Sequence, residues 1–308
     1  MDLKMYDIII IGAGPAGLTA AIYAKRAEKS VLLIEKETFG GQITHSPRVE
    51  NYPGFVSLSG SELGEKLLEQ AMAQGADIEL DTVTGISGTA GNITVTTEGG
   101  SFIGKTAIIA TGSKHRTLGI PGEDKFTGEG ISYCAVCDGA FYKGRSVIII
   151  GGGNSALQEA VLLSEGCSTV TVVQNLPFLT GEAKLQEILR GRSNVKVICS
   201  STVEAIIGEN EFQGIKIRNA DSGEISSLYA DGMFVAIGQK PENEAFADVV
   251  ELNEYGYVSA GEDCLPKTNI PGVFVAGDCR TKAIRQVTTA TADGATAAIA
   301  ACRFIDGL

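Results

Sequence analysis

Apolar residues along this chain follow two periods, and glycines mark the change from one to the other. The apolar run 7–11 has the length of a buried strand, and apolar positions three or four apart over 18–24 predict a helix after it. Between them lies the turn 12–17, with glycine at its first, third and sixth positions. A second apolar run, 30–34, predicts a further strand and leads to Glu35.

Strand, glycine turn, helix, strand and acid in this order are typical of a dinucleotide-binding unit. The glycines allow a tight turn and a close approach of the backbone to a pyrophosphate, and free N–H groups at the helix start bind the anion. The acid accepts hydrogen bonds from ribose hydroxyls. The candidate nucleotide-binding residues of this first unit are Gly12, Gly14, Pro15, Ala16, Gly17 and Glu35.

The same pattern recurs in the middle of the chain. An apolar run, 146–150, precedes a glycine turn, a helical pattern over 157–163 and a second strand over 169–173. The position that matches Glu35 is Gln174, an amide. The turn predicts a second nucleotide loop, although glycines there also serve plain packing of strand against helix. Its residues are Gly151, Gly153, Asn154, Ser155 and Ala156.

A late apolar run, 273–276, leads to Gly277 and Asp278 and supplies a last strand for the first unit. We therefore expect the second unit to be inserted into the first. The alternation over 82–102 and over 202–229 predicts antiparallel strands. The expected fold class is α/β, with two Rossmann-like, three-layer nucleotide-binding domains made of residues 1–116 with 246–308, and of residues 117–245.

Composition excludes several classes of protein. With 308 residues, 44% of them hydrophobic, the chain is long enough for two such domains. A formal net charge of −12 disfavours a nucleic-acid partner, because phosphate binding depends on clustered Lys and Arg. No apolar run reaches the roughly 18 residues of a membrane span, and the chain start lacks the pattern of a signal peptide. We expect a cytoplasmic protein with no membrane partner.

Two cysteines, Cys134 and Cys137, are separated by two residues and followed by Asp138. Zinc needs four ligands, and neither His45 nor His115 has a second ligand at suitable spacing, so no metal is expected. Two thiols at this spacing beside strand–helix units instead predict a dithiol–disulfide redox pair. The remaining cysteines are expected to be small buried residues: Cys167, Cys199, Cys264, Cys279 and Cys302.

Together the motifs resemble the low-molecular-weight thioredoxin reductase family, a class of FAD-dependent pyridine nucleotide-disulfide oxidoreductases, over the whole chain. The resemblance is carried by Gly12–Gly17, Gly40-Gly41-Gln42, Val49–Gly54, Ala110-Thr111-Gly112, Cys134–Asp138, and Gly277-Asp278 followed by Arg285-Gln286. It implies FAD in the outer domain, the redox cysteines in the inner domain, and a homodimer built through the FAD domains.

The resemblance also implies roles for residues around the flavin. Gln42 and Asn51 would approach the flavin, and Asp278 would hold the ribityl and phosphate region. Arg285 and Gln286 would face the edge of the isoalloxazine. The same motifs add Gly41, Thr111, Gly112 and Gly277 to the expected FAD site.

For the cysteines, the resemblance implies that Cys137 faces the flavin and that Cys134 exchanges with the disulfide of thioredoxin or a thioredoxin-like protein. Exchange passes through a thiolate and a mixed disulfide, so an acid and base nearby is needed, and Asp138 fits that role. Its alternative role is to cap a turn or helix before Gly139. One dithiol cannot meet flavin and protein partner at once, so the domains must rotate about the two crossings.

One motif departs from the family. NADPH-dependent members end the second strand of the inner domain with His-Arg-Arg, whose basic pair binds the 2′-phosphate, whereas this chain has Gln174-Asn175-Leu176. No acid stands there for an NADH ribose, although the two amides can hydrogen-bond hydroxyls. We hypothesise that NADPH is a poor donor, and the donor stays open among NADPH, NADH, reduced ferredoxin and a second flavin.

Two other functions stay open. A flavin-dependent dithiol oxidase, forming disulfides with O2 as acceptor, would use the same fold and the same cysteines. A flavoprotein that transfers electrons from ferredoxin to a pyridine nucleotide, or acts as a sensor, would leave the cysteines incidental. The intact Cys-x-x-Cys-Asp argues against the latter.

Overall fold

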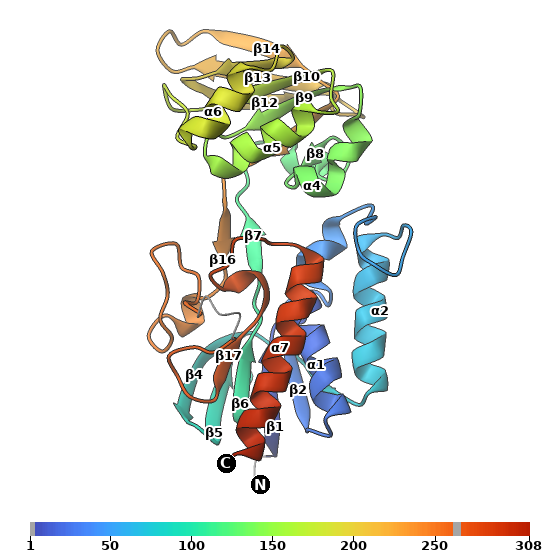
Figure 1. Ribbon diagram of the computed structural model, residues 1–308, viewed down its shortest axis with the longest axis vertical. Coiled ribbons are helices and arrows are strands. Elements are labelled where there is room, and N and C mark those ends of the chain that lie inside the picture. The colour runs from blue at the N-terminus through green and yellow to red at the C-terminus, as the bar shows by residue number, and fades with distance from the viewer. Residues whose placement is uncertain (1–3, 261–265) are drawn as a thin grey trace. The chain divides into compact units, whose positions relative to one another are not determined.

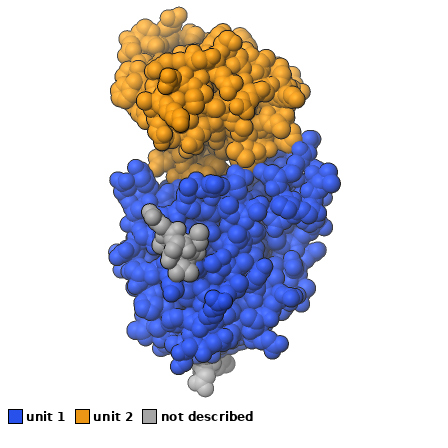
Figure 2. Space-filling model, viewed as in Figure 1, with its two compact units in different colours: residues 1–114, 240–308 blue, residues 115–239 orange. Residues whose placement is uncertain are grey.

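The computed structural model describes residues 4–260 and 266–308 (Figure 1). The chain divides into two compact units (Figure 2). Unit 1 comprises the residues up to Lys114 and those from Lys240 onward, and unit 2 comprises His115–Gln239. The sequence places the crossings at 116/117 and 245/246, a few residues further along at each. Which cofactor belongs to which unit stays a prediction.

Unit 1 is built on one mixed sheet of seven strands. They are β1 (Met5–Ile11), β2 (Val31–Glu35), β3 (Asp77–Leu80), β4 (Val83–Thr89), β5 (Asn92–Thr97), β6 (Ser101–Ile109) and β17 (Val273–Val275). The order is β3-β2-β1-β6-β5-β4, and β17 also pairs with β6. The late strand therefore returns to the first sheet after the chain has built unit 2.

The antiparallel strands expected over 82–102 are confirmed, because β4 pairs with β5 and β5 with β6 in that sense. One detail differs. The last antiparallel strand does not end near residue 102 but continues to Ile109 as a single element, β6, which pairs in parallel with β1 along most of its length. Its other edge pairs with β5 at one end and with β17 at the other.

Both faces of β1 are buried, which explains its uninterrupted apolar sequence. Ile8 and Ile10 pack in a core with the helices of unit 1, and Ile9 and Ile11 pack on the opposite face with Phe246. Figure 1 shows the long α7 beside α1 and α2. The helical segments are α1 (Pro15–Arg26), η1 (Gly41–His45), α2 (Gly60–Ala73), η3 (Glu244–Phe246), η4 (Gly277–Cys279) and α7 (Val287–Asp306).

Unit 2 contains a parallel five-stranded sheet in the order β11-β10-β9-β15-β8 and an antiparallel sheet β12-β13-β14, as expected for 202–229. The strands are β8 (Ile131–Ser132), β9 (Ser146–Ile150), β10 (Thr169–Val173), β11 (Val195–Ile198), β12 (Ser201–Ile207), β13 (Gly214–Asn219), β14 (Ile225–Tyr229) and β15 (Gly232–Val235). Its helical segments are α3 (Glu123–Phe126), α4 (Ala135–Asp138), η2 (Gly139–Tyr142), α5 (Asn154–Ser164) and α6 (Ala183–Arg190). At the crossings, β7 (Ser113–His115) pairs with β16 (Gln239–Pro241).

The α/β class is therefore confirmed, with helices covering a mixed sheet in unit 1 and a parallel sheet in unit 2. In the described part of the chain no helix has the length and apolar character to cross a membrane. Cys167, Cys279 and Cys302 are buried as expected. Cys199 is only partly buried, because it follows the edge strand β11. Cys264 lies outside the described residues.

Candidate active site

The two redox cysteines lie on one helical turn of unit 2. Cys134 and Cys137 form a disulfide, and their Cα atoms are 5.3 Å apart. Cys134 is the N-cap of α4, and the N–H of Cys137 lies 3.2 Å from its Sγ. Between them Ala135 is buried and Val136 is 60% exposed. The turn thus presents one side to the protein and the other to solvent.

Asp138 ends this turn with a buried carboxyl group. Its Oδ2 accepts a hydrogen bond from Ser132 Oγ at 2.6 Å. Its Oδ1 is buried and has no hydrogen-bond partner among residues 4–260 and 266–308. Burial raises the pKa of Asp138, and the Ser132 hydroxyl opposes the rise. The side chain makes no capping hydrogen bond, so the capping alternative is wrong and a proton-carrying role fits better.

A second carboxyl group near the turn was missed from the sequence. Glu159 lies on α5, which packs against α4, and a backbone hydrogen bond joins Ala135 to its carboxylate. Burial raises the pKa of Glu159 to about 7. The signal was present in the sequence, since Glu159 stands between the buried Ala156 and Leu163 on the apolar stripe of a helix.

The first glycine loop joins β1 to α1 in unit 1. Gly12 has φ +103°, and a Cβ there would lie 2.4 Å from the Ala110 carbonyl oxygen. A Cβ on Gly17 would lie 1.8 Å from the carbonyl oxygen of Gly12, so α1 can approach the strand only with glycine at this position. A Cβ on Gly14 meets nothing within 4 Å. Pro15 and Ala16 open the helix behind this open space.

Glu35 holds the first loop from the end of β2. Its Oε2 accepts a hydrogen bond from the Ala13 N–H at 2.7 Å, and its Oε1 accepts from the N–H groups of Lys36 and Glu37, both at 2.9 Å. A carboxylate offers about four acceptor positions. One therefore stays available for a ribose hydroxyl.

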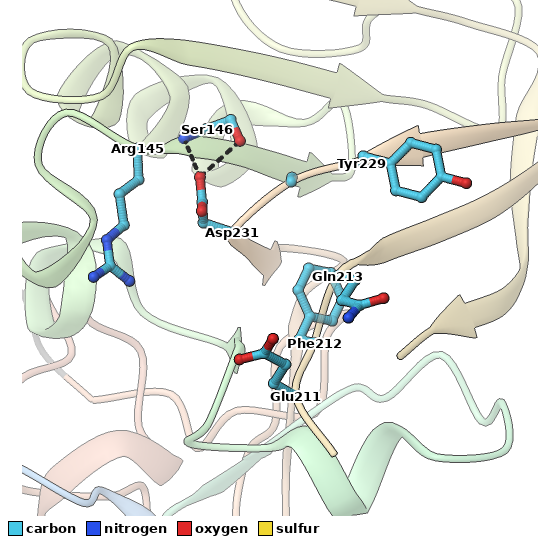
Figure 3. Close-up of a pocket in the computed structure, with 8 residues that line it drawn as sticks. Arg145, Ser146, Glu211, Phe212, Gln213, Tyr229 and Asp231 are labelled. Atoms are coloured by element: carbon cyan, nitrogen blue, oxygen red, sulfur yellow. Dashed lines mark hydrogen bonds between the residues drawn. The ribbon is translucent and has the colours of Figure 1, made fainter. Parts of the chain in front are cut away.

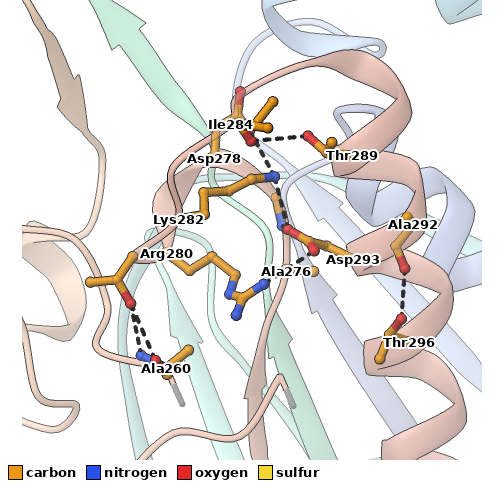
Figure 4. Close-up of polar contacts among 12 residues, drawn as sticks. Ala260, Ala276, Asp278, Arg280, Lys282, Ile284, Thr289, Ala292, Asp293 and Thr296 are labelled. Atoms are coloured by element: carbon orange, nitrogen blue, oxygen red, sulfur yellow. Dashed lines mark hydrogen bonds and ion pairs between the residues drawn. The ribbon is translucent and has the colours of Figure 1, made fainter. Parts of the chain in front are cut away.

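Asp278 begins a network of charged side chains that extends to α7 (Figure 4). Lys282 Nζ lies 3.4 Å from Asp278 Oδ1 and 3.0 Å from Asp293 Oδ2, and Arg280 Nη1 lies 3.1 Å from Asp293 Oδ1. Asp278 Oδ1 is buried and makes no hydrogen bond within the described chain. Burial raises the pKa of Asp278, while Lys282 and Arg285 oppose the rise. Asp293 was not singled out from the sequence.

The structure brings some of the other residues expected at the flavin close to one another. Asn51 Nδ2 lies 3.4 Å from Gln286 Oε1, which joins two motifs far apart in sequence. Gln42 is exposed in η1. The Arg285 guanidinium lies over the Tyr257 ring at 4.2 Å and donates to the Asp278 carbonyl at 3.4 Å. Among the remaining residues expected at the flavin, Gly41 opens η1 and Gly277 opens η4, while Thr111 and Gly112 follow the end of β6.

These features fit a dinucleotide cofactor in unit 1. The loop has an open space in front of Gly14, an acid placed on the loop at Glu35, and a buried carboxyl oxygen on Asp278 that makes no hydrogen bond within the described chain. Buried polar atoms generally have partners, so Asp278 Oδ1 is suited to a hydroxyl group of a bound ligand. The residues present therefore match the requirements of FAD.

The second glycine loop, between β9 and α5, is covered by the segment that follows β10. The Gly152 carbonyl accepts hydrogen bonds from the N–H groups of Thr180 at 2.8 Å and Gly181 at 2.9 Å. A Cβ on Gly152 would meet the Gln174 side chain at 2.6 Å, and one on Gly153 would meet Thr180 Oγ1 at 3.8 Å. The first loop is covered in a similar way by Gly40, whose N–H donates to the Ala13 carbonyl at 2.8 Å. The second loop differs because side chains, those of Gln174 and Thr180, lie against it.

The polar residues beside the second loop are engaged as well. The amide of Gln174, only 5% exposed, accepts from the Asn175 N–H at 3.2 Å and lies 3.4 Å from the Phe178 carbonyl. Asn154 lies 2.7 Å from the Glu182 N–H and 3.1 Å from its carboxylate. Ser155 is exposed at the start of α5, and Ala156 is buried behind it. A ribose could reach Gln174 only if these contacts broke.

Unit 2 also has a surface hollow of about 400 Å³ away from the glycine loop (Figure 3). Its walls include Arg145, Glu211 and Tyr229. Asp231 is held there by the N–H and hydroxyl of Ser146, at 2.7 and 2.8 Å. None of the redox or nucleotide-loop residues lines it, so we assign it no catalytic role.

Comparisons with known proteins support the same reading. The family model described as pyridine nucleotide-disulphide oxidoreductase matches residues 6–294. A Clostridium pasteurianum protein described as a 34.2 kDa protein in the rubredoxin operon is 43% identical over 99% of this chain and 98% of its own length. Thioredoxin reductase of Listeria monocytogenes is 40% identical over 99% of this chain and 95% of its own.

A solved structure agrees with the fold. The crystal structure of thioredoxin reductase from Streptococcus pyogenes is 37% identical, covers 99% of each chain and has a TM-score of 0.94. The two Rossmann-like domains expected from the sequence are thereby confirmed. This chain belongs to the pyridine nucleotide-disulphide oxidoreductase family, resembles its low-molecular-weight thioredoxin reductases, and is a FAD-dependent disulfide oxidoreductase.

Proposed function

We propose that this protein passes electrons from FAD in unit 1, through the Cys134/Cys137 dithiol of unit 2, to the disulfide of thioredoxin or a thioredoxin-like protein. The observation that carries the proposal is the redox turn itself, where a disulfide lies beside the buried carboxyl of Asp138. The names of the relatives, which are thioredoxin reductases, favour the same substrate.

The first glycine loop and its surroundings would hold the cofactor. N–H groups at the start of α1 bind the pyrophosphate, Glu35 binds the adenosine ribose, and Asp278 binds the ribityl chain. Bound FAD would supply a carrier of two electrons. The proposed FAD residues are Gly12, Gly14, Pro15, Ala16, Gly17, Glu35, Gly41, Gln42, Asn51, Thr111, Gly112, Gly277, Asp278, Arg285 and Gln286.

In the dithiol, Cys134 is the thiol that attacks the partner disulfide, and Cys137 is the one that faces the flavin. Attack requires a thiolate, and the leaving thiolate of the partner must be protonated. Asp138 carries that proton, because burial raises its pKa toward the range in which an acid both gives and takes protons. Ser132 orients its carboxyl through the 2.6 Å hydrogen bond.

We further propose that NADPH is a poor electron donor. Asn175 and Leu176 stand where a basic pair would bind the 2′-phosphate, and no guanidinium replaces it in the sequence. The close packing of Gln174 and Thr180 against the second loop supports the proposal. NADH, reduced ferredoxin or a second flavin are the donors to compare, and a homodimer is the expected assembly.

Single-turnover mixing tests the function without a physiological donor. Protein reduced anaerobically with one equivalent of dithionite is mixed with oxidised thioredoxin, and thioredoxin thiols are counted after an acid quench. We expect one dithiol per reduced enzyme, and Cys134→Ser should form none while retaining its flavin. Full thioredoxin reduction by Cys134→Ser would exclude the dithiol route. Peroxide as the main product in air, with dithiol as substrate, would favour the oxidase instead.

A further inference from the structure

Glu159 is a buried carboxyl group that contacts the redox turn from a neighbouring helix. It lies on α5 among the buried Ala156, Ala160 and Leu163. A backbone hydrogen bond from Ala135, the residue after Cys134, reaches its carboxylate. Its Oε2 is buried and makes no hydrogen bond to any residue that the structure describes. Such a group is costly as an anion, and packing alone does not require an acid there.

Among the residues that the structure describes, no charged group near Glu159 compensates its charge. Strands β9 and β10, which pack against α5, carry no ionisable side chain. On α6 the ionisable residues are Lys184, Glu187 and Arg190, and on the redox turn and η2 they are Asp138, Cys134, Cys137 and Tyr142. None of these residues acts on the pKa of Glu159. Burial raises this pKa to about 7, and the Ala135 N–H opposes the rise.

We propose that Glu159 is a positioning residue for the Cys134–Cys137 couple and that it binds a proton when the disulfide is reduced and releases it on reoxidation. Two electrons break the S–S bond and leave one thiolate and one thiol, the thiol taking a proton from solvent. A thiolate on Cys134 is adjacent in sequence to Ala135, whose N–H donates to the Glu159 carboxylate. Repulsion between the two negative charges therefore favours the protonated form of Glu159. The inference rests on the proposed role of these cysteines, but on neither donor nor partner.

The direction of the pH effect follows from the pKa of Glu159. Below about pH 7 the carboxyl is protonated in both redox states, so reduction changes nothing at this residue. Above about pH 7, Glu159 is ionised in the oxidised protein, which has the disulfide. In the reduced protein a nearby thiolate raises the pKa of Glu159 further, so Glu159 binds a proton. Proton uptake by Glu159 therefore begins near neutrality and makes the dithiol easier to form as pH falls toward 7.

Redox titration of the holoenzyme measures this uptake. Wild type, Glu159→Gln and the control Glu165→Gln are equilibrated in glutathione redox buffers from about pH 6 to 8.5, quenched, alkylated and assayed by mass spectrometry of the 134–137 peptide. The amide introduced by Glu159→Gln still accepts the Ala135 N–H but cannot titrate. Glu165 lies at the far end of the same helix with its side chain 61% exposed. The assay needs neither an electron donor nor thioredoxin, so its result does not depend on whether the protein reduces thioredoxin.

We expect wild type and Glu165→Gln to take up nearly one more proton per two electrons above pH 7 than Glu159→Gln does, and all three to agree below pH 7. Equal pH dependence in wild type and Glu159→Gln overturns the proposal. If Glu159→Gln does not fold, infrared difference spectra of the wild-type protein decide. A carboxylic-acid band that appears on reduction and shifts with ¹³C-labelled glutamate supports the proposal, and its absence contradicts it.

Discussion

The two glycine loops of this protein share one sequence pattern and differ in what lies against them. In unit 1 the segment after the second strand covers the loop with glycine, since the Gly40 N–H donates to the Ala13 carbonyl at 2.8 Å. The space in front of Gly14 is open, and Glu35 fixes the loop with its carboxylate. In unit 2 the side chains of Gln174 and Thr180 approach Gly152 and Gly153, and the Gly152 carbonyl accepts three hydrogen bonds from residues 180 and 181. A glycine turn thus establishes the backbone of a nucleotide site, while the segment after the second strand decides whether a nucleotide can use it.

The packing of helix on strand also differs between the loops. Gly17 and Ala156 occupy matching positions in the two loops. Ala156 carries a Cβ and is buried, whereas a Cβ on Gly17 would collide with the Gly12 carbonyl. The first helix therefore lies closer to its loop than the second. Close approach matters where a cofactor must be bound tightly, since backbone N–H groups then reach its pyrophosphate.

Replacing Gly17 by alanine should have the largest effect. Its Cβ would lie 1.8 Å from a carbonyl oxygen, so we expect a loss of about 3 kcal/mol or more in the free energy of unfolding, with loss of bound flavin. The matched change Ala156→Gly should cost only about 1 kcal/mol, the helix propensity difference. Urea unfolding and flavin absorbance measure both. Similar losses in the two variants would show that the loops are packed alike.

Restoring the basic pair should give the next largest effect. The double variant Asn175→Arg/Leu176→Arg supplies guanidinium groups to a 2′-phosphate, and we expect NADPH to bind about 10- to 100-fold more tightly. The neutral pair Asn175→Gln/Leu176→Met is the control. Stopped-flow flavin reduction over a range of NADPH concentrations gives the affinity. No gain over the control would mean that the covering segment, and not the missing charge, excludes the nucleotide.

Glu182→Gln should have the smallest effect. The carboxylate lies 3.1 Å from Asn154 at the start of α5, where it competes with a bound pyrophosphate for the helix end. In the background of the double-arginine variant we expect removal of this charge to tighten NADPH binding by about threefold. Glu187→Gln, on the neighbouring α6, serves as control. An equal change in both variants would point to overall charge and remove the local role of Glu182.

Much of this architecture could be predicted from local patterns. The strands beside both loops are short apolar runs bounded by glycine, and the strand at 273–275 completes the first sheet as expected. The continuity of β6 was not predictable, because the alternation over 82–102 is followed by Gly104 and Lys105, which interrupt the apolar pattern. Pairing with β1, a tertiary contact, makes this region one strand.

The site was predictable to the extent that its residues belong to motifs. The disulfide pair and the first loop could be found, but the burial of Gln174 could not, because it depends on how residues 178–181 fold back on Gly152. The pairing of Lys282 with Asp293 likewise joins a loop to α7 through space. Glu159 was within reach, since an acid on an apolar helical stripe is unusual.

The central claim is that the first loop serves a tightly bound FAD while the second does not serve NADPH. Anaerobic mixing of the purified holoprotein with micromolar NADPH tests it most directly, with the flavin absorbance band followed in time and no thioredoxin or other electron acceptor added. We predict about one FAD per chain and a flavin band that stays oxidised with NADPH yet bleaches with dithionite. Rapid bleaching at micromolar NADPH would contradict the account.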